Sequence, residues 1–320
     1  MADKLLFDGP IPDTIELVNG FLEYLKTEKS ASHHTIVNYE IDLRQFIKFL
    51  GEHCGPRIDF DRQLTLKLLR EFLSLQMQKY ERATVARRLS LVKSFMKYLH
   101  QEGCVEKNLA RLIRLPRPHL KLPYTLRPQE IVQLIEQAPI ATLRDRRLKA
   151  VLELLYSAGL RISEAVGLSY ANIDLPRNQI RVFGKGSRER LVPIGLHCRA
   201  ALGEYIKAVP VSQKRGSETP LFLNRDGERV SVRTLQRQLQ AYAIEVLGPK
   251  GALVTPHTFR HSCATHLLGA GAGLREIQEL LGHRTLVTTQ KYTHMDTERL
   301  KSAYKQAHPR ENRRKKEIET

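Results

Sequence analysis

Apolar residues recur three and four positions apart through about the first hundred residues of the chain. Residues at this spacing lie on one face of a helix, so the pattern predicts amphipathic helices. Two of them cover residues 34–50 and 83–99, and two more lie near Ile15–Thr27 and Leu64–Lys79. Their apolar stripes are most simply the core of a helical domain, formed in the two clearest cases by Ile36, Tyr39, Leu43, Phe46, Ile47 and Leu50 and by Val85, Leu89, Val92, Phe95, Met96 and Leu99.

A basic, proline-rich segment then interrupts the helical pattern. The stretch "RLPRPHLKLP", residues 114–123, contains three prolines and three Lys or Arg residues. Proline cannot continue a helix, so we interpret the segment as an extended linker whose charge suits a phosphate backbone. It divides the chain into a helical N-terminal domain, residues 1–119, and a second domain, residues 120–320.

The second domain mixes helices with one β-hairpin. In "NQIRVFGKGSRERLVPI", residues 178–194, two short β-rich runs flank a Gly-Lys-Gly-Ser turn, which predicts a hairpin with a basic tip. The expected fold class is therefore mainly α with a small β-sheet or hairpin. Helical spacing predicts further helices, the second of them closed by Gly159, at Pro128–Gln137, Arg144–Ser157, Leu196–Ala208 and Val232–Leu247.

The charge of the chain indicates what such a fold would bind. The sequence has 52 Lys and Arg against 34 Asp and Glu, a net charge of +18 and a pI of about 9.9. Such an excess favours a polyanionic partner, most commonly nucleic acid, with an anionic membrane surface as the alternative. The fourth helix carries a set of cations that suits a DNA-facing surface, namely Arg82, Arg87, Arg88, Lys93 and Lys97.

Apolar runs and cysteines limit the cellular setting. No apolar run approaches the length that spans a bilayer and no N-terminal signal pattern is seen, so we expect a cytoplasmic protein without a membrane partner. The cysteines are far apart in the sequence and form no close pair, which favours free thiols over a zinc site. They are Cys54, Cys104, Cys198 and Cys263.

The densest polar chemistry lies in "TPHTFRHSCATHLLGAG", residues 255–271. His257 and His261 have the spacing of a zinc-binding helix, but Thr258 stands where a zinc protease needs a glutamate. Thr255 followed by proline predicts a helix N-cap. His257 would then lie at a helix start, where free N–H groups and the helix dipole favour an anion.

Arg260 decides between a metal and an anion in this stretch. It lies on the same helix face as His257, where a guanidinium opposes a divalent cation and can grip a phosphate with two hydrogen bonds. We therefore predict a phosphate site, with no metal and no cofactor. His261 and His266 are expected to be packed and hydrogen-bonded without a functional role.

Two other segments contribute candidate side chains. In "SAGLRISEAVGLS", Arg161 begins a helix and Glu164 could hold it, although an ordinary surface ion pair is the simpler explanation when the pair is taken alone. In "LREIQELLGHRTLVTTQKYTH", a helix ends at Gly282, His283 follows in the turn and Tyr292 lies on the next helix. A tyrosine with a pKa of about 10 is a poor nucleophile unless cations stabilise its phenolate. Together with a lysine on the hairpin, these groups form a set for phosphoryl transfer without a metal.

The motifs "GLRISE", "GKGSRER", "TPHTFRHSCATHLL", "LLGH" and "TTQKYTH" resemble, in order and spacing, those of the tyrosine recombinases, also called the phage integrase family. The resemblance covers nearly the whole chain, and the first helices look like the family's N-terminal core-binding domain. It implies a two-domain, C-shaped clamp around DNA. The ending "YKQAHPR" resembles the Xer subfamily of chromosome-dimer resolvases, and the basic tail beyond it favours the XerC branch over the XerD branch.

Carried over residue by residue, the resemblance implies that Tyr292 attacks the scissile phosphate, forms a 3′-phosphotyrosine link and releases a 5′-hydroxyl. Arg161 and Arg260 would hold the non-bridging oxygens. Lys185, at the hairpin tip, would protonate the leaving 5′ oxygen.

The two histidines would complete the resemblance-based site. His257 would assist by hydrogen bonding or proton transfer at the phosphate, and His283 would support the same transition state. The resemblance implies no cofactor, ATP or metal, because the bond energy is kept in the phosphotyrosine.

The resemblance also implies partners. They are double-stranded DNA with a dif-like site, a second Xer recombinase or another copy of the chain in a tetramer, and a translocase of the FtsK type. The C-terminal segment Glu298 to His308 would dock on an adjacent protomer. The alternatives are a mobile-element integrase of the same family, a type IB topoisomerase-like nicking enzyme and a non-catalytic architectural DNA-binding protein.

Overall fold

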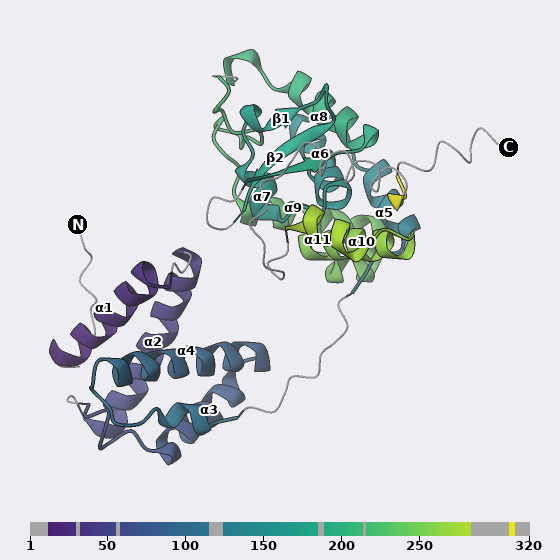
Figure 1. The fold of residues 1–320 in the computed structure, drawn as a ribbon. Coiled ribbons are helices and arrows are strands. Elements are labelled where there is room, and N and C mark those ends of the chain that lie inside the picture. Colours follow the sequence, from purple (N-terminus) through teal and green to yellow (C-terminus); the bar gives the residue numbers. More distant parts are fainter. Residues whose placement is uncertain are drawn as a thin grey trace. The chain divides into compact units, whose positions relative to one another are not determined.

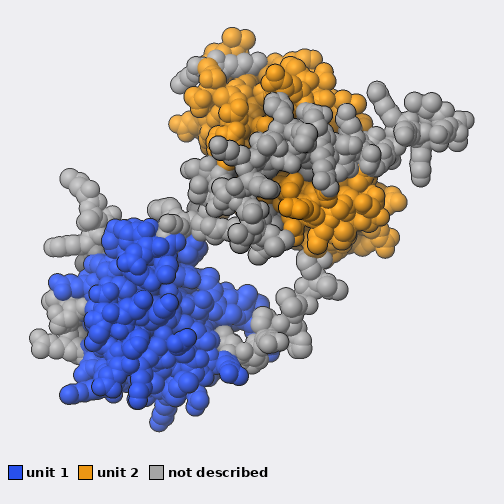
Figure 2. Space-filling view, in the orientation of Figure 1, with its two compact units in different colours: residues 1–121 blue, residues 122–320 orange. Residues whose placement is uncertain are grey.

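The computed structural model (Figure 1) describes residues 12–29, 33–55, 58–114, 124–184, 189–213, 216–282 and 307–310. The chain divides into two compact units, residues 1–121 and 122–320, which are blue and orange in Figure 2. Each unit has a hydrophobic core of its own. The expected domain boundary near Leu120 falls among residues outside the described part.

Helices are the regular secondary structure in the described part of unit 1. Helix α4 packs against each of the other three helices, and the rings of Phe21 and Phe95 meet in the core with centroids 5.2 Å apart. These helices confirm the four that hydrophobic spacing predicted. Their bounds, with one 3-10 turn, are α1 Pro12–Thr27, α2 His33–Cys54, α3 Leu66–Lys79, α4 Arg82–Gln101 and η1 Leu109–Leu112.

One α4 cation that was expected to face DNA, Arg88, is buried instead. The Arg88 side chain is 5% exposed, and its Nε donates to the buried carboxylate of Asp42 at 3.1 Å while Nη1 donates to Gln76. Arg87 donates two hydrogen bonds to the same carboxylate. An uncompensated buried carboxylate is costly, and both arginines neutralise Asp42, although the Arg87 side chain is 40% exposed. The expectation is wrong for Arg88.

Unit 2 is a mixed domain built around helix α6. This helix packs against α8 and α10 and also contacts α5, α7 and α9, and residues from all its faces are buried. The mainly α fold class with a small sheet is confirmed. The bounds are α5 Pro128–Glu136, α6 Leu143–Ser157, α7 Ile162–Gly167, η2 Tyr170–Asn172, β1 Ile173–Asp174, β2 Gln179–Phe183, β3 Glu189–Pro193, α8 Leu196–Ala208, η3 Val211–Gln213, α9 Val232–Leu247, η4 Gly248–Leu253, α10 Pro256–Gly269 and α11 Leu274–Leu281.

The predicted hairpin forms the greater part of an antiparallel sheet with strand order β1-β2-β3. Strands β2 and β3 pair from Gln179 opposite Pro193 to Phe183 opposite Glu189. Ile180, Val182 and Val192 are buried on one side of this ribbon. The hairpin tip, which includes Lys185, lies outside the described residues.

The described C-terminal residues pack on their own chain. His308 is fully buried beside Tyr156 of α6, with ring centroids 5.1 Å apart, and Arg310 Nη2 donates to Glu153 at 2.6 Å. The yellow segment in Figure 1 is this piece of chain. Ala307 and His308, at the end of the segment expected to dock on an adjacent protomer, are thus buried against their own chain; residues 298–306 lie outside the described part, and the docking stays a prediction.

Two smaller expectations concern cysteines and membranes. All four cysteines are free, and Cys198 and Cys263 are buried. Among the described helices none has the length and apolar character needed to cross a bilayer.

Candidate functional site

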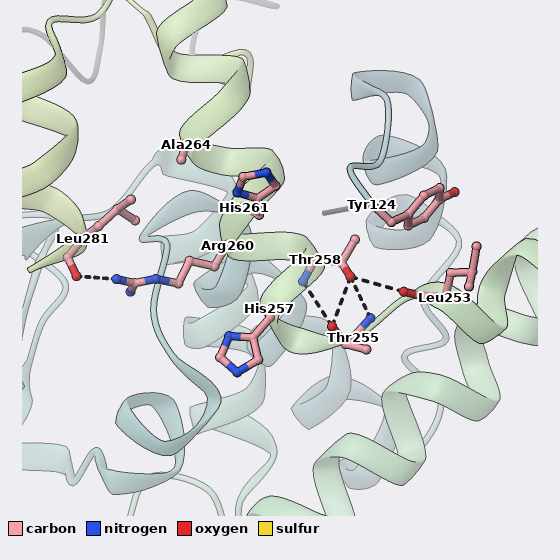
Figure 3. A pocket seen from close by; sticks show the side chains of 9 residues that line it. All are labelled: Tyr124, Leu253, Thr255, His257, Thr258, Arg260, His261, Ala264 and Leu281. Atoms are coloured by element: carbon pink, nitrogen blue, oxygen red, sulfur yellow. Dashed lines mark hydrogen bonds between the residues drawn. The ribbon is translucent and has the colours of Figure 1, made fainter. Parts of the chain in front are cut away.

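Helix α10 begins where its N-cap sequence predicts. The Thr255 hydroxyl accepts a hydrogen bond from the Thr258 N–H at 3.2 Å, and Pro256 occupies the first turn. The capping leaves His257 exposed at the helix start. Figure 3 shows His257 and Arg260 near the start of α10, with the Arg260 side chain directed toward Leu281.

Arg260 is buried and held by two backbone carbonyls. Its Nη1 donates to the carbonyl of Gly159 and its Nη2 to that of Leu281, so it ties the end of α6 to the end of α11. Burial, and then the nearby charge of Arg161, lower the pKa of Arg260 to about 10, against the opposing effect of Glu164. The guanidinium therefore stays charged at neutral pH.

Gly159 makes this arrangement possible. It has a φ of 58°, in the left-handed region that favours glycine, and a Cβ added there would lie 2.6 Å from Leu281. The predicted helix end at Gly159 is confirmed, and its packing brings the α6 and α11 ends close enough to share Arg260.

Arg161 stands at the N-cap of α7 beside Glu164. Its Nη1 donates to Glu164 Oε1 at 2.8 Å, and its backbone N–H donates to Oε2 at 2.9 Å. The Arg161 side chain is 41% exposed, whereas that of Glu164 is 6% exposed. The pair is therefore more than a surface ion pair, because its carboxylate lies inside the protein.

Glu164 is shared among three arginines. Besides Arg161, it pairs with Arg190 of β3 through two parallel hydrogen bonds of 3.1 and 2.9 Å, and Arg260 Nη1 lies 3.8 Å from its Oε2. Burial alone would raise the pKa of Glu164, but the hydrogen bonds and charges of Arg190, and then Arg161, outweigh it and lower the pKa. Three positive charges face one negative charge, which leaves the cluster attractive to a phosphate.

Arg190 was missed in the sequence, although a signal was available. It lies two residues before Val192 on β3, so strand alternation places it on the same, buried side. A cation predicted to point inward requires a buried partner. The partner itself, Glu164, is far away in the sequence and could not be named from spacing.

An open pocket of 480 Å³ lies beside α10, and Figure 3 shows its lining side chains. His257 and Arg260 both border it, together with Leu281 at the end of α11. The structure thus brings together three of the six predicted site residues: Arg161 and Arg260 through Glu164, and His257 through the shared pocket. Lys185, His283 and Tyr292 lie outside the described residues.

The other two histidines of α10 have different surroundings. His266 is partly buried, and its Nδ1 lies 2.9 Å from the Tyr156 hydroxyl, as expected of a packed, hydrogen-bonded histidine. His261 is exposed and borders the pocket, so the expectation that it is packed is wrong. In the described part of the chain, no three His, Cys, Asp or Glu side chains are grouped to hold a metal ion.

Comparison with known proteins defines the class of this site. Residues 124–299 match the phage integrase family and residues 18–103 match the family's N-terminal SAM-like domain. The chain belongs to the phage integrase family, the tyrosine recombinases. It is a site-specific recombinase that cuts and rejoins DNA, and the family uses no metal.

Its relatives include proteins called tyrosine recombinase XerC. That of Pelobacter propionicus is 39% identical over 92% of this chain and 96% of its own length, and that of Natranaerobius thermophilus is 40% identical over 91% and 97%. The chain is thus XerC-like.

Solved structures share the fold. One is the XerH site-specific recombinase bound to palindromic difH substrate, with 24% identity, a TM-score of 0.63 and coverage of 90% of this chain and 84% of that one. Another is the Tn1549 transposon integrase in complex with circular intermediate DNA, with 19% identity, a TM-score of 0.65 and coverage of 88% and 98%. Both structures contain DNA, and at these identities they show that the fold is shared.

Proposed function

We propose that this protein is a Xer-type recombinase that resolves chromosome dimers at a dif-type site. The names and coverage of its XerC relatives support the subtype. The observation that carries the chemistry is the tethering of Arg161 and Arg260 to one buried carboxylate, with Arg260 and His257 facing one open pocket. This arrangement presents cations to a phosphate without a metal ion.

In the proposed reaction, the Tyr292 oxygen attacks the scissile phosphorus and forms a new P–O bond. The bond from phosphorus to the 5′ oxygen breaks, and Lys185 gives that oxygen a proton, while the proton of the phenol passes to solvent. The products are a 3′-phosphotyrosine and a free 5′-hydroxyl. A 5′-hydroxyl of a partner strand then reverses the step, which exchanges strands with no net loss of phosphodiester bonds.

Two described arginines would stabilise the charge that develops on the phosphate. Arg161, at a helix N-cap and 41% exposed, is placed to reach a bound group. Arg260 is rigidly held by carbonyls of Gly159 and Leu281, so its orientation is set before DNA arrives. Preorganised donors of this kind lower the barrier because they need no reorganisation during the reaction.

The histidines would flank this pair. His257 is exposed at the first turn of α10, where it can donate a hydrogen bond to the phosphate or exchange a proton with it. His283 follows the Gly282 cap of α11 in the sequence and would support the same transition state.

The proposed assembly is a tetramer on two DNA sites, formed with a second Xer recombinase or with further copies of this chain. An FtsK-type translocase would control it in the cytoplasm. A mobile-element integrase is the second candidate, since it would use the same residues at another DNA site. The XerC names of the relatives favour the first.

The chemistry is tested with end-labelled DNA that carries a candidate chromosomal recombination site and a nick beside the cleavage position. With EDTA present, we expect a 3′-linked protein–DNA adduct on denaturing gels from the wild type and from the control Tyr39→Phe. Tyr292→Phe should bind the DNA and give no adduct. An adduct that persists in Tyr292→Phe, or one that needs a divalent metal, contradicts the proposal; if the wild type alone gives none, the second recombinase is added.

A further inference from the structure

We infer that Arg190 is a positioning residue for DNA cleavage: it holds Glu164, and through it the Arg161–Arg260 pair, in register with the C-terminal end of α11. The inference rests on the proposed function, because it explains what positions Arg161 and Arg260, the two arginines proposed to bind the phosphate. Arg190 itself is 7% exposed and is not proposed to touch DNA.

Arg190 joins three elements that are distant in the sequence. From β3, it makes two parallel hydrogen bonds to Glu164 of α7, at 3.1 and 2.9 Å. Its Nε donates to the Leu280 carbonyl of α11 at 3.3 Å. The guanidinium is planar with donors on several edges, so one side chain can fix a carboxylate and a carbonyl at the same time.

The end of α11 is held by two arginines together. Arg190 binds the carbonyl of Leu280, and Arg260 binds that of Leu281. Carbonyls in the last turn of a helix have no partner within the helix and carry its negative dipole end, so cations are well placed there. The same two arginines share Glu164. The positions of both guanidinium groups are therefore fixed by the two carbonyls together with this carboxylate.

Gly282 shows how closely Arg190 approaches this helix end. The glycine caps α11 with a φ of 66°, and a Cβ added to it would lie 3.2 Å from the Arg190 guanidinium. The chain thus leaves α11 directly against Arg190, and His283 is the next residue. A shift of Arg190 would move both the carboxylate that orients Arg161 and the helix end that precedes His283.

Arg190 also keeps Glu164 charged. Burial raises the pKa of this carboxyl, and the hydrogen bonds and charge of Arg190 are the first contributions that lower it, followed by those of Arg161. Without Arg190, Glu164 would face Arg161 and, at 3.8 Å, Arg260. Its pKa would rise, and a protonated Glu164 would hold Arg161 less firmly.

The test measures single-turnover cleavage of the nicked DNA at saturating DNA, with affinity measured separately by mobility shift. We expect Arg190→Gln to lower the cleavage rate about 100-fold, the order of loss for a small misplacement in an active site, with unchanged affinity. Arg190→Lys should recover part of the rate, since lysine keeps the charge but cannot make two parallel hydrogen bonds. The matched control is Arg181→Gln, an exposed arginine on neighbouring β2 paired with Glu189 at 3.1 Å, which should cleave at the wild-type rate.

A second pair of variants tests whether Arg190 acts through Glu164. The double variant Arg190→Gln with Glu164→Gln should be no slower than Glu164→Gln alone, because the two changes remove one interaction. This variant removes both charges of the Arg190–Glu164 pair at once while Arg260 keeps its two carbonyl partners, so it remains informative where Arg190→Gln unfolds. In Arg190→Gln the rate relative to wild type should fall as the pH is lowered, because Glu164 becomes protonated.

The outcomes separate the two levels of the argument. An adduct that depends on Tyr292 but forms equally fast in wild type and Arg190→Gln overturns this inference alone. Rate losses that multiply in the double variant, or a lost affinity with an unchanged rate, overturn it as well. An adduct that survives Tyr292→Phe overturns the proposed function.

Discussion

At the scale of single residues, the molecule uses arginine both as a structural and as a chemical group. Arg88 and Arg190 are buried against carboxylates, whereas Arg161 is half-exposed beside one. The net charge of the sequence therefore overstates the number of cations that can contact DNA, because it includes buried arginines. Only the partner of each arginine shows which role it has.

The first prediction concerns Arg88 in unit 1. Arg88→Met should lower the free energy of unfolding of this unit by about 3 kcal/mol, because it removes one of the two arginines that neutralise buried Asp42. Hydrogen exchange of α4 peptides measures the loss. The control is Arg82→Met, an exposed position on the same helix, which should change the stability by less than about 0.5 kcal/mol.

The double variant Asp42→Asn with Arg88→Met provides the check on the cause. It should be more stable than Arg88→Met alone, since the carboxylate that needs a cation is gone. Equal or greater destabilisation in the double variant would mean that packing of the Arg88 stem, not its charge, stabilises the unit.

At the scale of elements, the site depends on where helices end. Arg161 caps α7, Arg260 binds the ends of α6 and α11, and His257 lies in the first turn of α10. Helix termini expose unsatisfied backbone groups, and here side chains of the candidate site satisfy several of them. Capping residues thus set the positions of the cations.

The second prediction compares two glycines of unit 2. Gly159→Ala should destabilise the unit by about 2 kcal/mol and slow cleavage, since it strains a left-handed residue and pushes on Leu281, whose carbonyl holds Arg260. Gly203→Ala, inside α8 with open space around its Cβ, should instead stabilise by about 0.5 kcal/mol. Urea unfolding of both variants gives the signs, and two changes of the same sign would contradict the argument.

Element ends are also where sequence reasoning succeeded. The Thr255 N-cap, the Gly159 helix end and the two hairpin strands follow from local rules of capping, φ and alternation, and all three are confirmed. The sharing of Glu164 among three arginines could not be predicted, because it joins α7, β3 and α10 across long stretches of sequence. Helical spacing does place Arg88 on the buried stripe between Val85 and Val92, but it could not name the partner Asp42 on α2.

At the scale of the whole molecule, unit 2 closes on itself through its last described residues. His308 lies beside Tyr156, and Arg310 pairs with Glu153 of α6 and, at 3.7 Å, with Glu136 of α5. The Arg310 N–H donates to His308 Nδ1 at 3.3 Å, so this nitrogen carries no proton in the folded state. Protonation of His308 at this nitrogen would therefore oppose the packing of residues 307–310 on unit 2.

The third prediction follows from this histidine. Burial lowers the pKa of His308 to about 3, whereas an unfolded histidine titrates at about 6.5. Between these values the unfolded chain binds more protons, so the free energy of unfolding of unit 2 should fall as the pH is lowered from about 6.5 toward 3. Urea midpoints measured across this range should fall less steeply in His308→Gln than in the wild type.

Two neighbours of His308 titrate as well, and the comparison with the variant separates them. Burial also lowers the pKa of His266, and burial raises that of Glu153 against the effect of Arg310. Both groups are present in His308→Gln, so the difference between the two profiles belongs to His308. Exposed His261→Gln is the control and should keep the wild-type slope; identical profiles for wild type and His308→Gln would contradict the assignment.

The Arg310–Glu153 pair has a consequence for how the protein is made. A ribosome adds residues from the N-terminus, so Glu153 is in place long before the cation that neutralises it is synthesised. A chain released early, short of Arg310, leaves a buried carboxylate uncompensated and its catalytic unit weakened. Proteases act on unfolded chains, so such incomplete copies should be more susceptible to degradation than the full-length protein.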